Sequence, residues 1–240
     1  MGMSMSISQN GDHIQLEKVS DVNLESGQLM RVKNFTSKFI QPRDVDIWLP
    51  ESYSEEKEYD VLYMHDGQML FDSTTTWNKQ EWKVDEIVSG LIDSAKIKNT
   101  IVVAIWNHSD IRHTDYYPNK PFQSLPIKLR DSIIKFSKKQ YGSDFKSPNS
   151  DNYLKFIVEE VKPFVDGNFS VETNIENTVI AGSSMGGLIS RYALNYMESQ
   201  NIDHDTRLYI SFDAPHTGAN VPIGFQHMFN FLAYGLDTWA

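Results

Sequence analysis

One serine lies in a sequence context that could support nucleophilic catalysis. Ser184 belongs to the run Val179-Ile180-Ala181-Gly182-Ser183-Ser184-Met185-Gly186-Gly187, which contains the pattern G-x-S-x-G. An apolar run precedes the pattern and helical periodicity follows it, which is the strand–turn–helix context of a nucleophile elbow. The glycines at 182 and 186 leave room for the tight backbone that lifts a hydroxyl clear of a sheet. The pattern therefore predicts Ser184 as the nucleophile of an acyl-transfer reaction; the alternative is a glycine-rich turn with a structural role alone.

The backbone around Ser184 also predicts how a negatively charged oxygen would be held. A helix that begins directly after the serine directs its free N–H groups and its dipole towards the nucleophile, so we expect Met185 N–H to be one oxyanion donor. A second donor should come from the loop after the apolar run 61–64, which reads His65-Asp66-Gly67-Gln68-Met69. We expect Gln68 or Met69 to donate its backbone N–H. The first two residues of this loop should shape it, with the histidine buried and hydrogen-bonded.

The base and the acid of a serine triad should follow Ser184, because the chain order in enzymes with this elbow is serine, acid, histidine. The histidines in that part of the chain are His204, His216 and His227. Asp213 and His216 follow the carboxyl end of the apolar run 208–212, and such ends form the sites of open α/β sheets. The sequence therefore predicts His216 as the base and Asp213 as its orienting acid. The alternative is that Pro215-His216 is a structural turn and that the triad is incomplete.

Composition narrows the classes of partner and of site. The chain of 240 residues carries a net charge of −10 without a Lys/Arg cluster, which argues against nucleic acid and favours a neutral ester as substrate. It has no cysteine, which excludes disulfides, a cysteine nucleophile and thiolate metal ligands. No run approaches the ~20 apolar residues of a membrane span. Residues 1–10 lack the pattern of a secretory signal, so we expect a cytoplasmic protein.

Apolar runs alternate with helical periodicity along the chain. Val45, Ile47 and Leu49 alternate with polar residues, as in a strand with one buried face. Strands buried on both faces of a parallel sheet are predicted by continuous apolar runs at 61–64, 101–106, 178–181 and 208–212. Helices are predicted at 81–93, 151–165 and 185–198, and Pro163 should kink or end the second one. This alternation predicts an α/β fold with a mostly parallel, doubly wound sheet flanked by helices.

We expect the whole chain, residues 1–240, to form a single domain. The segment 107–148 is too long for a simple connection, and its second half, from Ile127 to Tyr141, is basic and amphipathic. Because this segment follows the carboxyl end of a predicted strand, we expect a lid or substrate wall over the site. A surface excursion without such a role is the alternative.

Several blocks of the sequence resemble one family of hydrolases. In chain order they are 45–50 (VDIWLP), 59–68 (YDVLYMHDGQ), Trp77 with 82–86, 101–107 with Arg112 and 116–118, 153–165, and 182–187. Over about residues 30–190 the chain is similar to the esterase D and enterochelin-esterase-like esterases of the α/β-hydrolase superfamily. The resemblance implies an α/β-hydrolase fold and hydrolysis of carboxylic esters by a Ser-His-acid triad, without a metal or an organic cofactor.

The resemblance ends near Leu188. Residues 207–220 are instead similar to lipase-like hydrolases at a Pro-His-x-Gly turn, whose histidine in that branch is generally not the triad base. We therefore expect a chain that is either truncated or joins the front of one hydrolase to part of another. The segment 225–234 is apolar and should pack on its own sheet, or else on a second subunit as a homodimer.

Together these features predict a serine carboxylesterase that acts on a small-molecule ester through an acyl-enzyme on Ser184. Two alternatives stay open. One is a catalytically weak or vestigial binding protein with an incomplete triad. The other is an acyltransferase, in which an alcohol replaces water as the acceptor.

Overall fold

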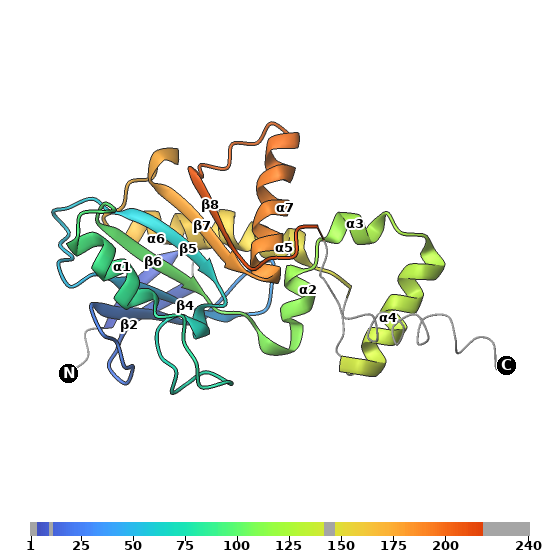
Figure 1. Ribbon diagram of the computed structural model, residues 1–240, viewed down its shortest axis with the longest axis horizontal. Coiled ribbons are helices and arrows are strands. Elements are labelled where there is room, and N and C mark those ends of the chain that lie inside the picture. Colours follow the sequence, from blue (N-terminus) through green and yellow to red (C-terminus); the bar gives the residue numbers. More distant parts are fainter. Residues whose placement is uncertain (1–3, 10–11, 142–146, 218–240) are drawn as a thin grey trace.

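The computed structural model describes residues 4–9, 12–141 and 147–217, which are built around one eight-stranded sheet (Figure 1). The strands are β1 (Ser4–Gln9), β2 (Asp12–Val19), β3 (Gln28–Phe35), β4 (Arg43–Leu49), β5 (Asp60–His65), β6 (Thr100–Ile105), β7 (Thr178–Ser183) and β8 (Leu208–Phe212). Their order across the sheet is β1-β2-β3-β4-β6-β5-β7-β8. The five strands predicted from apolar runs are present as β4 to β8, whereas β1 to β3 are additional.

The sheet has an antiparallel half and a parallel half. Strands β1 to β4 pair antiparallel in chain order, and β4 pairs antiparallel with β6. Strands β6, β5, β7 and β8 pair parallel with their neighbours. Six of the eight strands therefore run in the same direction, which confirms the predicted mostly parallel α/β sheet. The carboxyl ends of the four parallel strands meet at one edge, where sites form in open sheets of this kind.

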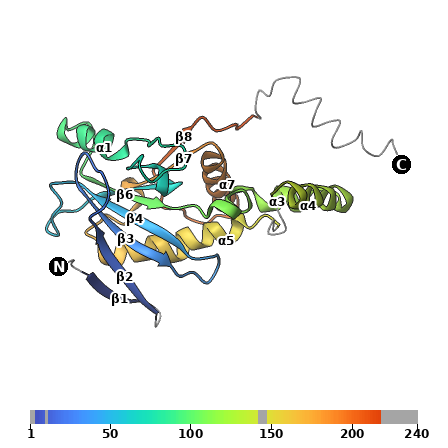
Figure 2. The same ribbon diagram turned by 90° about the horizontal axis from the view of Figure 1, so that it is seen from below.

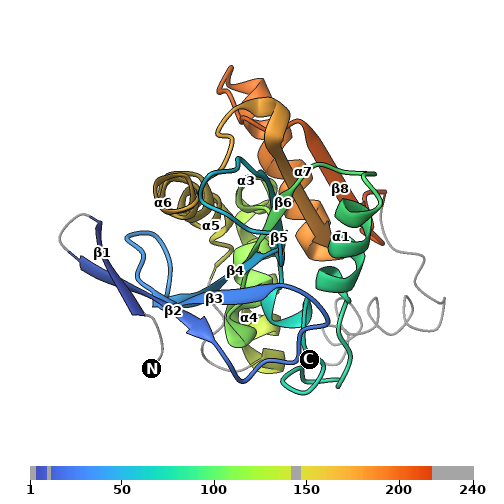
Figure 3. The same ribbon diagram turned by 90° about the vertical axis from the view of Figure 1, so that its left-hand side faces the viewer.

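Helices cover both faces of the sheet (Figure 3). The α-helices are α1 (Val84–Asp93), α2 (Arg112–Tyr116), α3 (Asn119–Gln123), α4 (Ile127–Tyr141), α5 (Ser150–Lys155), α6 (Lys162–Asn168) and α7 (Met185–Ser199). Single turns are η1 (Gly67–Met69), η2 (Ser109–Ile111) and η4 (Ile175–Asn177), and η3 (Phe156–Val161) is a π-helix between α5 and α6. Within the described residues, no helix has the length and apolar character that crossing a membrane requires.

Two apolar clusters lie between the sheet and the helices that cover its two faces. On one face, α1 contributes Val84 and Val88 to a cluster that includes Trp48. On the other face, α5 to α7 pack on the sheet, and Phe156 and Phe164 contact Phe35 edge-on. Burial of these side chains stabilises the fold by roughly 25 cal/mol per Å² of apolar surface. The sheet is therefore held between α1 and the helices α5 to α7.

Three sequence-based expectations differ from the structure. Strand β8 was expected to be buried on both faces, but Leu208 and Phe212 are 45% and 49% exposed because β8 lies at the edge of the sheet. Strand β4 was expected to have one buried face, but Trp48 on its other face is fully buried under the α1 side. The helix that contains Pro163 continues to Asn168, since the proline falls in the first turn of α6, directly after the π-helix.

The segment 107–148 begins against the sheet and then leaves it. Helix α2 is anchored by a buried ion pair between Asp115 and Arg43 of β4 (2.8 Å), with both side chains 1% exposed. Burial raises the pKa of Asp115, while Arg43 acts in the opposite direction. Helices α3 and α4 lie beyond the end of the sheet (Figures 1 and 2). The role of the segment 107–148 as a lid or substrate wall stays a prediction. So does the expectation that residues 1–240 form a single domain.

Candidate active site

Ser184 lies at the turn between β7 and α7, at the carboxyl edge of the sheet. Its backbone angles are φ 53° and ψ −119°, in a region that L residues rarely adopt and that costs about 1–3 kcal/mol. Its N–H donates to Phe212 O at the end of β8 (2.9 Å), which fastens the turn to the neighbouring strand. The Ser184 side chain is exposed, whereas that of Ser183 is half-buried. The backbone thus has the geometry of the predicted elbow, and the role of the serine stays a prediction.

Glycines allow α7 to begin so close to two strands. A Cβ on Gly182 would overlap the carbonyl carbon of Gly186. A Cβ on Gly187 would lie 2.7 Å from Ala214 Cβ and 2.8 Å from Ser211 Oγ. Any larger residue at these positions would displace the backbone, because the atoms that it would overlap belong to the backbone or to short, rigid side chains. The close approach of β7, β8 and α7 therefore depends on these glycines.

The expected oxyanion donors differ in whether their N–H groups already donate a hydrogen bond within the protein. Met185 is the first residue of α7, so its N–H has no acceptor within the helix. In the loop after β5, Met69 N–H donates to Asp66 O (2.8 Å) and is occupied. Gln68 N–H has no acceptor among the described residues, while Gln68 Oε1 accepts from Asn107 N–H (3.1 Å). Of the two loop residues, Gln68 is therefore the one whose N–H is available for an oxyanion.

The loop after β5 and the first turn of α7 lie side by side. Strands β5 and β7 are parallel neighbours, with Met64 opposite Ala181. A Cβ on Gly186 would lie 3.2 Å from His65 Cβ. The structure thus brings the segments that carry Gln68 and Met185 together beside Ser184.

His216 follows β8 at the same edge, but its ring faces the strand. Its Nε2 lies 2.8 Å from Ser211 Oγ and 3.2 Å from Tyr209 Oη. Asp213 is exposed and has φ 47°. In the part of the chain that the structure describes, no hydrogen bond or ion pair connects His216 with Ser184 or Asp213. The assignment of His216 and Asp213 as base and acid stays a prediction.

Other candidate residues lie elsewhere or outside the described residues. His204 Nε2 lies 3.5 Å from the Glu198 carboxylate, beyond the carboxyl end of α7. His227 and the apolar segment 225–234 lie outside the described residues, so the expected homodimer contact stays a prediction. Among residues 12–141 and 147–217, no group of three or more His, Asp or Glu side chains could hold a metal ion.

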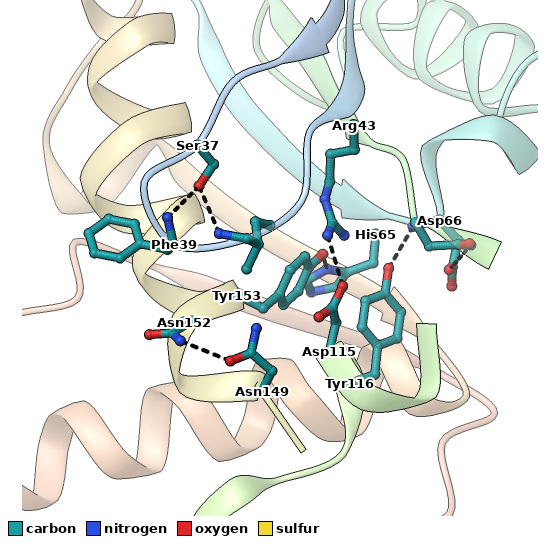
Figure 4. A network of polar contacts seen from close by, with 12 residues as sticks. Ser37, Phe39, Arg43, His65, Asp66, Asp115, Tyr116, Asn149, Asn152 and Tyr153 are labelled. Carbon is teal, nitrogen blue, oxygen red and sulfur yellow. Dashed lines mark hydrogen bonds and ion pairs between the residues drawn. The ribbon is translucent and has the colours of Figure 1, made fainter. Parts of the chain in front are cut away.

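His65 is buried and has partners on both ring nitrogens, which confirms the expectation that it is a buried, hydrogen-bonded histidine (Figure 4). Nδ1 lies 2.7 Å from Tyr153 Oη, and Nε2 lies 2.8 Å from Ser190 Oγ. Burial lowers the pKa of His65 to about 4, with Asp66 acting against this shift and Arg112 adding to it. The ring is therefore neutral at pH 7. Because both of its nitrogens already have partners, it cannot accept a proton from a substrate.

Asp66 fastens the same loop to the next strand and to α2. Its carboxylate accepts two hydrogen bonds from Arg112, each 2.7 Å long, and one from Asn107 Nδ2 (2.7 Å). A bidentate contact between arginine and a carboxylate fixes orientation as well as distance. Its backbone N–H donates to Tyr116 Oη (3.3 Å), and its φ of 59° turns the chain sharply into η1. The position of Gln68 thus depends on contacts from two other segments.

The sequence of this chain matches the model of the Esterase family, described as "Putative esterase", over residues 36–199. The match covers more than half of the chain and includes the loop after β5 and the elbow at Ser184. The chain belongs to this family. The resemblance found in the sequence blocks is therefore confirmed.

Several known proteins are similar to this chain in sequence or in structure. An endo-1,4-beta-xylanase/feruloyl esterase from Xylanibacter ruminicola is 24% identical over 171 residues, which cover 69% of this chain and 19% of that protein. An IroE-like serine hydrolase from Shewanella oneidensis has a similar structure (TM-score 0.53, 21% identity, 86% of this chain and 54% of that one). So does the siderophore hydrolase EstA from Aspergillus nidulans (TM-score 0.51, 22% identity, 75% and 56%). These structures show the shared α/β-hydrolase fold, and this chain spans only part of each relative's length.

The buried environment of His65 predicts how the stability of this esterase-family protein depends on pH. The folded protein holds His65 neutral down to a pKa of about 4, whereas the unfolded chain takes up the proton near pH 6.5. The free energy of unfolding should therefore fall by about 3 kcal/mol as the pH drops through this interval, at ~1.4 kcal/mol per pH unit. Urea unfolding at several pH values measures it. His65→Gln should make the free energy of unfolding depend less on pH in this interval. An unchanged slope would contradict the assignment of this pH dependence to His65.

Proposed function

We propose that this protein is a serine carboxylesterase with Ser184 as its nucleophile. The observation that carries the proposal is the exposed Ser184 in a strained turn between β7 and α7, beside the available N–H groups of Met185 and Gln68. Membership of the esterase family supports it. The name of one relative, a feruloyl esterase, agrees with an ester substrate, and the name of another, a siderophore hydrolase, agrees with hydrolysis.

In the proposed reaction, Ser184 Oγ attacks the ester carbonyl carbon while a base accepts the serine proton. The carbonyl oxygen becomes negatively charged and accepts hydrogen bonds from Met185 and Gln68 N–H. Collapse of this intermediate releases the alcohol, which takes the proton from the base, and leaves the acyl group on Ser184. Water then attacks the acyl-enzyme, and the carboxylic acid leaves as the serine hydroxyl is restored.

For the base we propose His216, oriented by Asp213. Support comes from its position, since the strand it follows ends at Phe212, whose carbonyl accepts from Ser184 N–H. To act, the imidazole must leave Ser211 Oγ, which is 2.8 Å away, and turn towards Ser184. The contact between His216 and Ser211 also favours a competing function, because it holds the ring away from Ser184. In that case the protein is a hydrolase-fold protein that binds esters and turns them over slowly.

His216→Ala distinguishes these two functions. If His216 is the base, the variant should lose about 10³-fold or more in kcat, because a triad without its base retains only oxyanion and binding effects. His204→Ala is the matched control and should keep the wild-type rate, since His204 lies beside Glu198. Equal rates in wild type and His216→Ala would show that His216 is not the base.

Hydrolysis of p-nitrophenyl acetate and p-nitrophenyl butyrate by the wild-type protein tests the function as a whole. A burst of p-nitrophenol followed by steady release is expected from an acyl-enzyme. Analysis of the products in the presence of glycerol separates hydrolysis from acyl transfer, because a transferase yields the glyceryl ester. Absence of turnover with both esters would contradict the proposed function.

A further inference from the structure

A chain of buried contacts runs from α7 through His65 to the loop after β5, and Figure 4 shows its part from His65 and Tyr153 to Tyr116 and Asp66. Ser190 Oγ donates its single hydrogen to Gly186 O (2.9 Å), so towards His65 it can only accept. Nε2 of His65 must therefore carry the hydrogen of the ring. The ring is neutral, so Nδ1 is bare and accepts from Tyr153 Oη (2.7 Å).

Beyond Tyr153 the chain of contacts continues to the loop after β5 through a second tyrosine. Tyr153 packs against Tyr116, with the centroids of the two rings 5.1 Å apart. Tyr116 Oη in turn accepts from Asp66 N–H (3.3 Å). The side chains of His65, Tyr116, Tyr153 and Ser190 are each 1% exposed or less, so water does not compete for these bonds.

This chain joins the two segments that carry the proposed oxyanion donors. Its first group, Asp66 N–H, lies two residues before Gln68, and its last group, Gly186 O, lies one residue after Met185. We infer that His65 is a positioning residue whose Nε2–H tautomer sets the spacing between Gln68 N–H and Met185 N–H. The inference rests on the proposed function, because it assigns a role within that oxyanion site.

Kinetics of two variants test the inference. His65→Phe removes the contacts of both ring nitrogens, and Ser190→Ala removes the contact of Nε2 and the bond to Gly186 O while keeping the contact between Nδ1 and Tyr153. Each should lower kcat by about 10- to 100-fold with little change in KM, because misplaced donors weaken transition-state binding more than ground-state binding. The double variant should lose little more than either single variant, since both break one chain. His65→Gln, which can still donate to Ser190, should recover part of the rate.

Asn177→Ala is the matched control. Its side chain is also buried and hydrogen-bonded, to Asp60, but at the opposite end of β5 and β7. It should lower the free energy of unfolding while leaving kcat unchanged. The inference is wrong if Asn177→Ala lowers kcat as much as Ser190→Ala does, or if the losses in the double variant add. Ser190→Ala keeps this test valid if His65→Phe does not fold.

A second measurement is independent of esterase activity and thus separates failure of the inference from failure of the proposed function. Proton–nitrogen correlation NMR of the wild-type protein reports which ring nitrogen of each histidine carries hydrogen. The signals of the His65 ring are identified because they are missing from the spectrum of His65→Gln. They should show a hydrogen on Nε2 and none on Nδ1. A hydrogen on Nδ1 at pH 7 would overturn the inference, whether or not the protein hydrolyses esters.

Discussion

Replacement of Ser184 by alanine should abolish ester hydrolysis almost completely. We expect kcat/KM for p-nitrophenyl acetate to fall by about 10⁴-fold or more, since the proposed acyl-enzyme forms on the hydroxyl that this variant lacks. The fold should survive, because the Ser184 N–H that donates to Phe212 O belongs to the backbone and is kept. Alanine also meets the same backbone strain at φ 53° as serine does. Initial rates with purified protein measure the loss.

Ser183→Ala is the control for this substitution. Ser183 is the last residue of β7, and its side chain is half-buried rather than exposed. The variant should keep most of the wild-type rate. If Ser183→Ala loses as much activity as Ser184→Ala, or if Ser184→Ala retains full activity, Ser184 is not the nucleophile.

Gly182→Ala should have the second largest effect, on both stability and activity. The added Cβ would overlap the carbonyl carbon of Gly186 and lie 2.5 Å from its oxygen, so β7 and the first turn of α7 must separate. We expect a loss of about 3 kcal/mol in the free energy of unfolding, at the upper end for overpacked sites. Any protein that folds should lose at least about 100-fold in kcat, because the nucleophile and the Met185 N–H both move.

Gly167→Ala is the control for this second prediction. Gly167 lies in α6, and a Cβ there would meet no atom within 4 Å. Alanine favours the helix, so this variant should be as stable as wild type or more stable by about 0.5–1 kcal/mol. Urea unfolding monitored by circular dichroism compares the two variants. Equal stabilities would show that the close approach of β7 and α7 does not depend on glycine at 182.

The elbow and the parallel strands could be predicted because their signals are local. The apolar run before Gly182 and the helical spacing after Met185 lie within a few residues of Ser184, and both elements formed where expected. The edge position of β8 could not be predicted, because a continuous apolar run is the same for a central strand and for an edge strand. Exposure of Leu208 depends on strand order, which is a property of the whole sheet.

The contacts around His65 could be predicted only in part. Its burial follows from its position at a strand end, but its partners Tyr153 and Ser190 are 88 and 125 residues away in sequence. No periodicity or spacing relates residues so far apart. Likewise, the sequence places His216 after a strand at the correct edge, but the direction of its ring depends on Ser211 and Tyr209, which compete for Nε2.

Covalent labelling with a fluorophosphonate tests the central claim most directly. The probe phosphonylates activated serine hydroxyl groups, and peptide mass spectrometry identifies the modified residue. We expect one phosphonyl group per protein molecule, attached to Ser184, and none in Ser184→Ala. Absence of labelling in folded wild-type protein, or labelling at Ser183 or another serine, would contradict the assignment of Ser184 as the nucleophile.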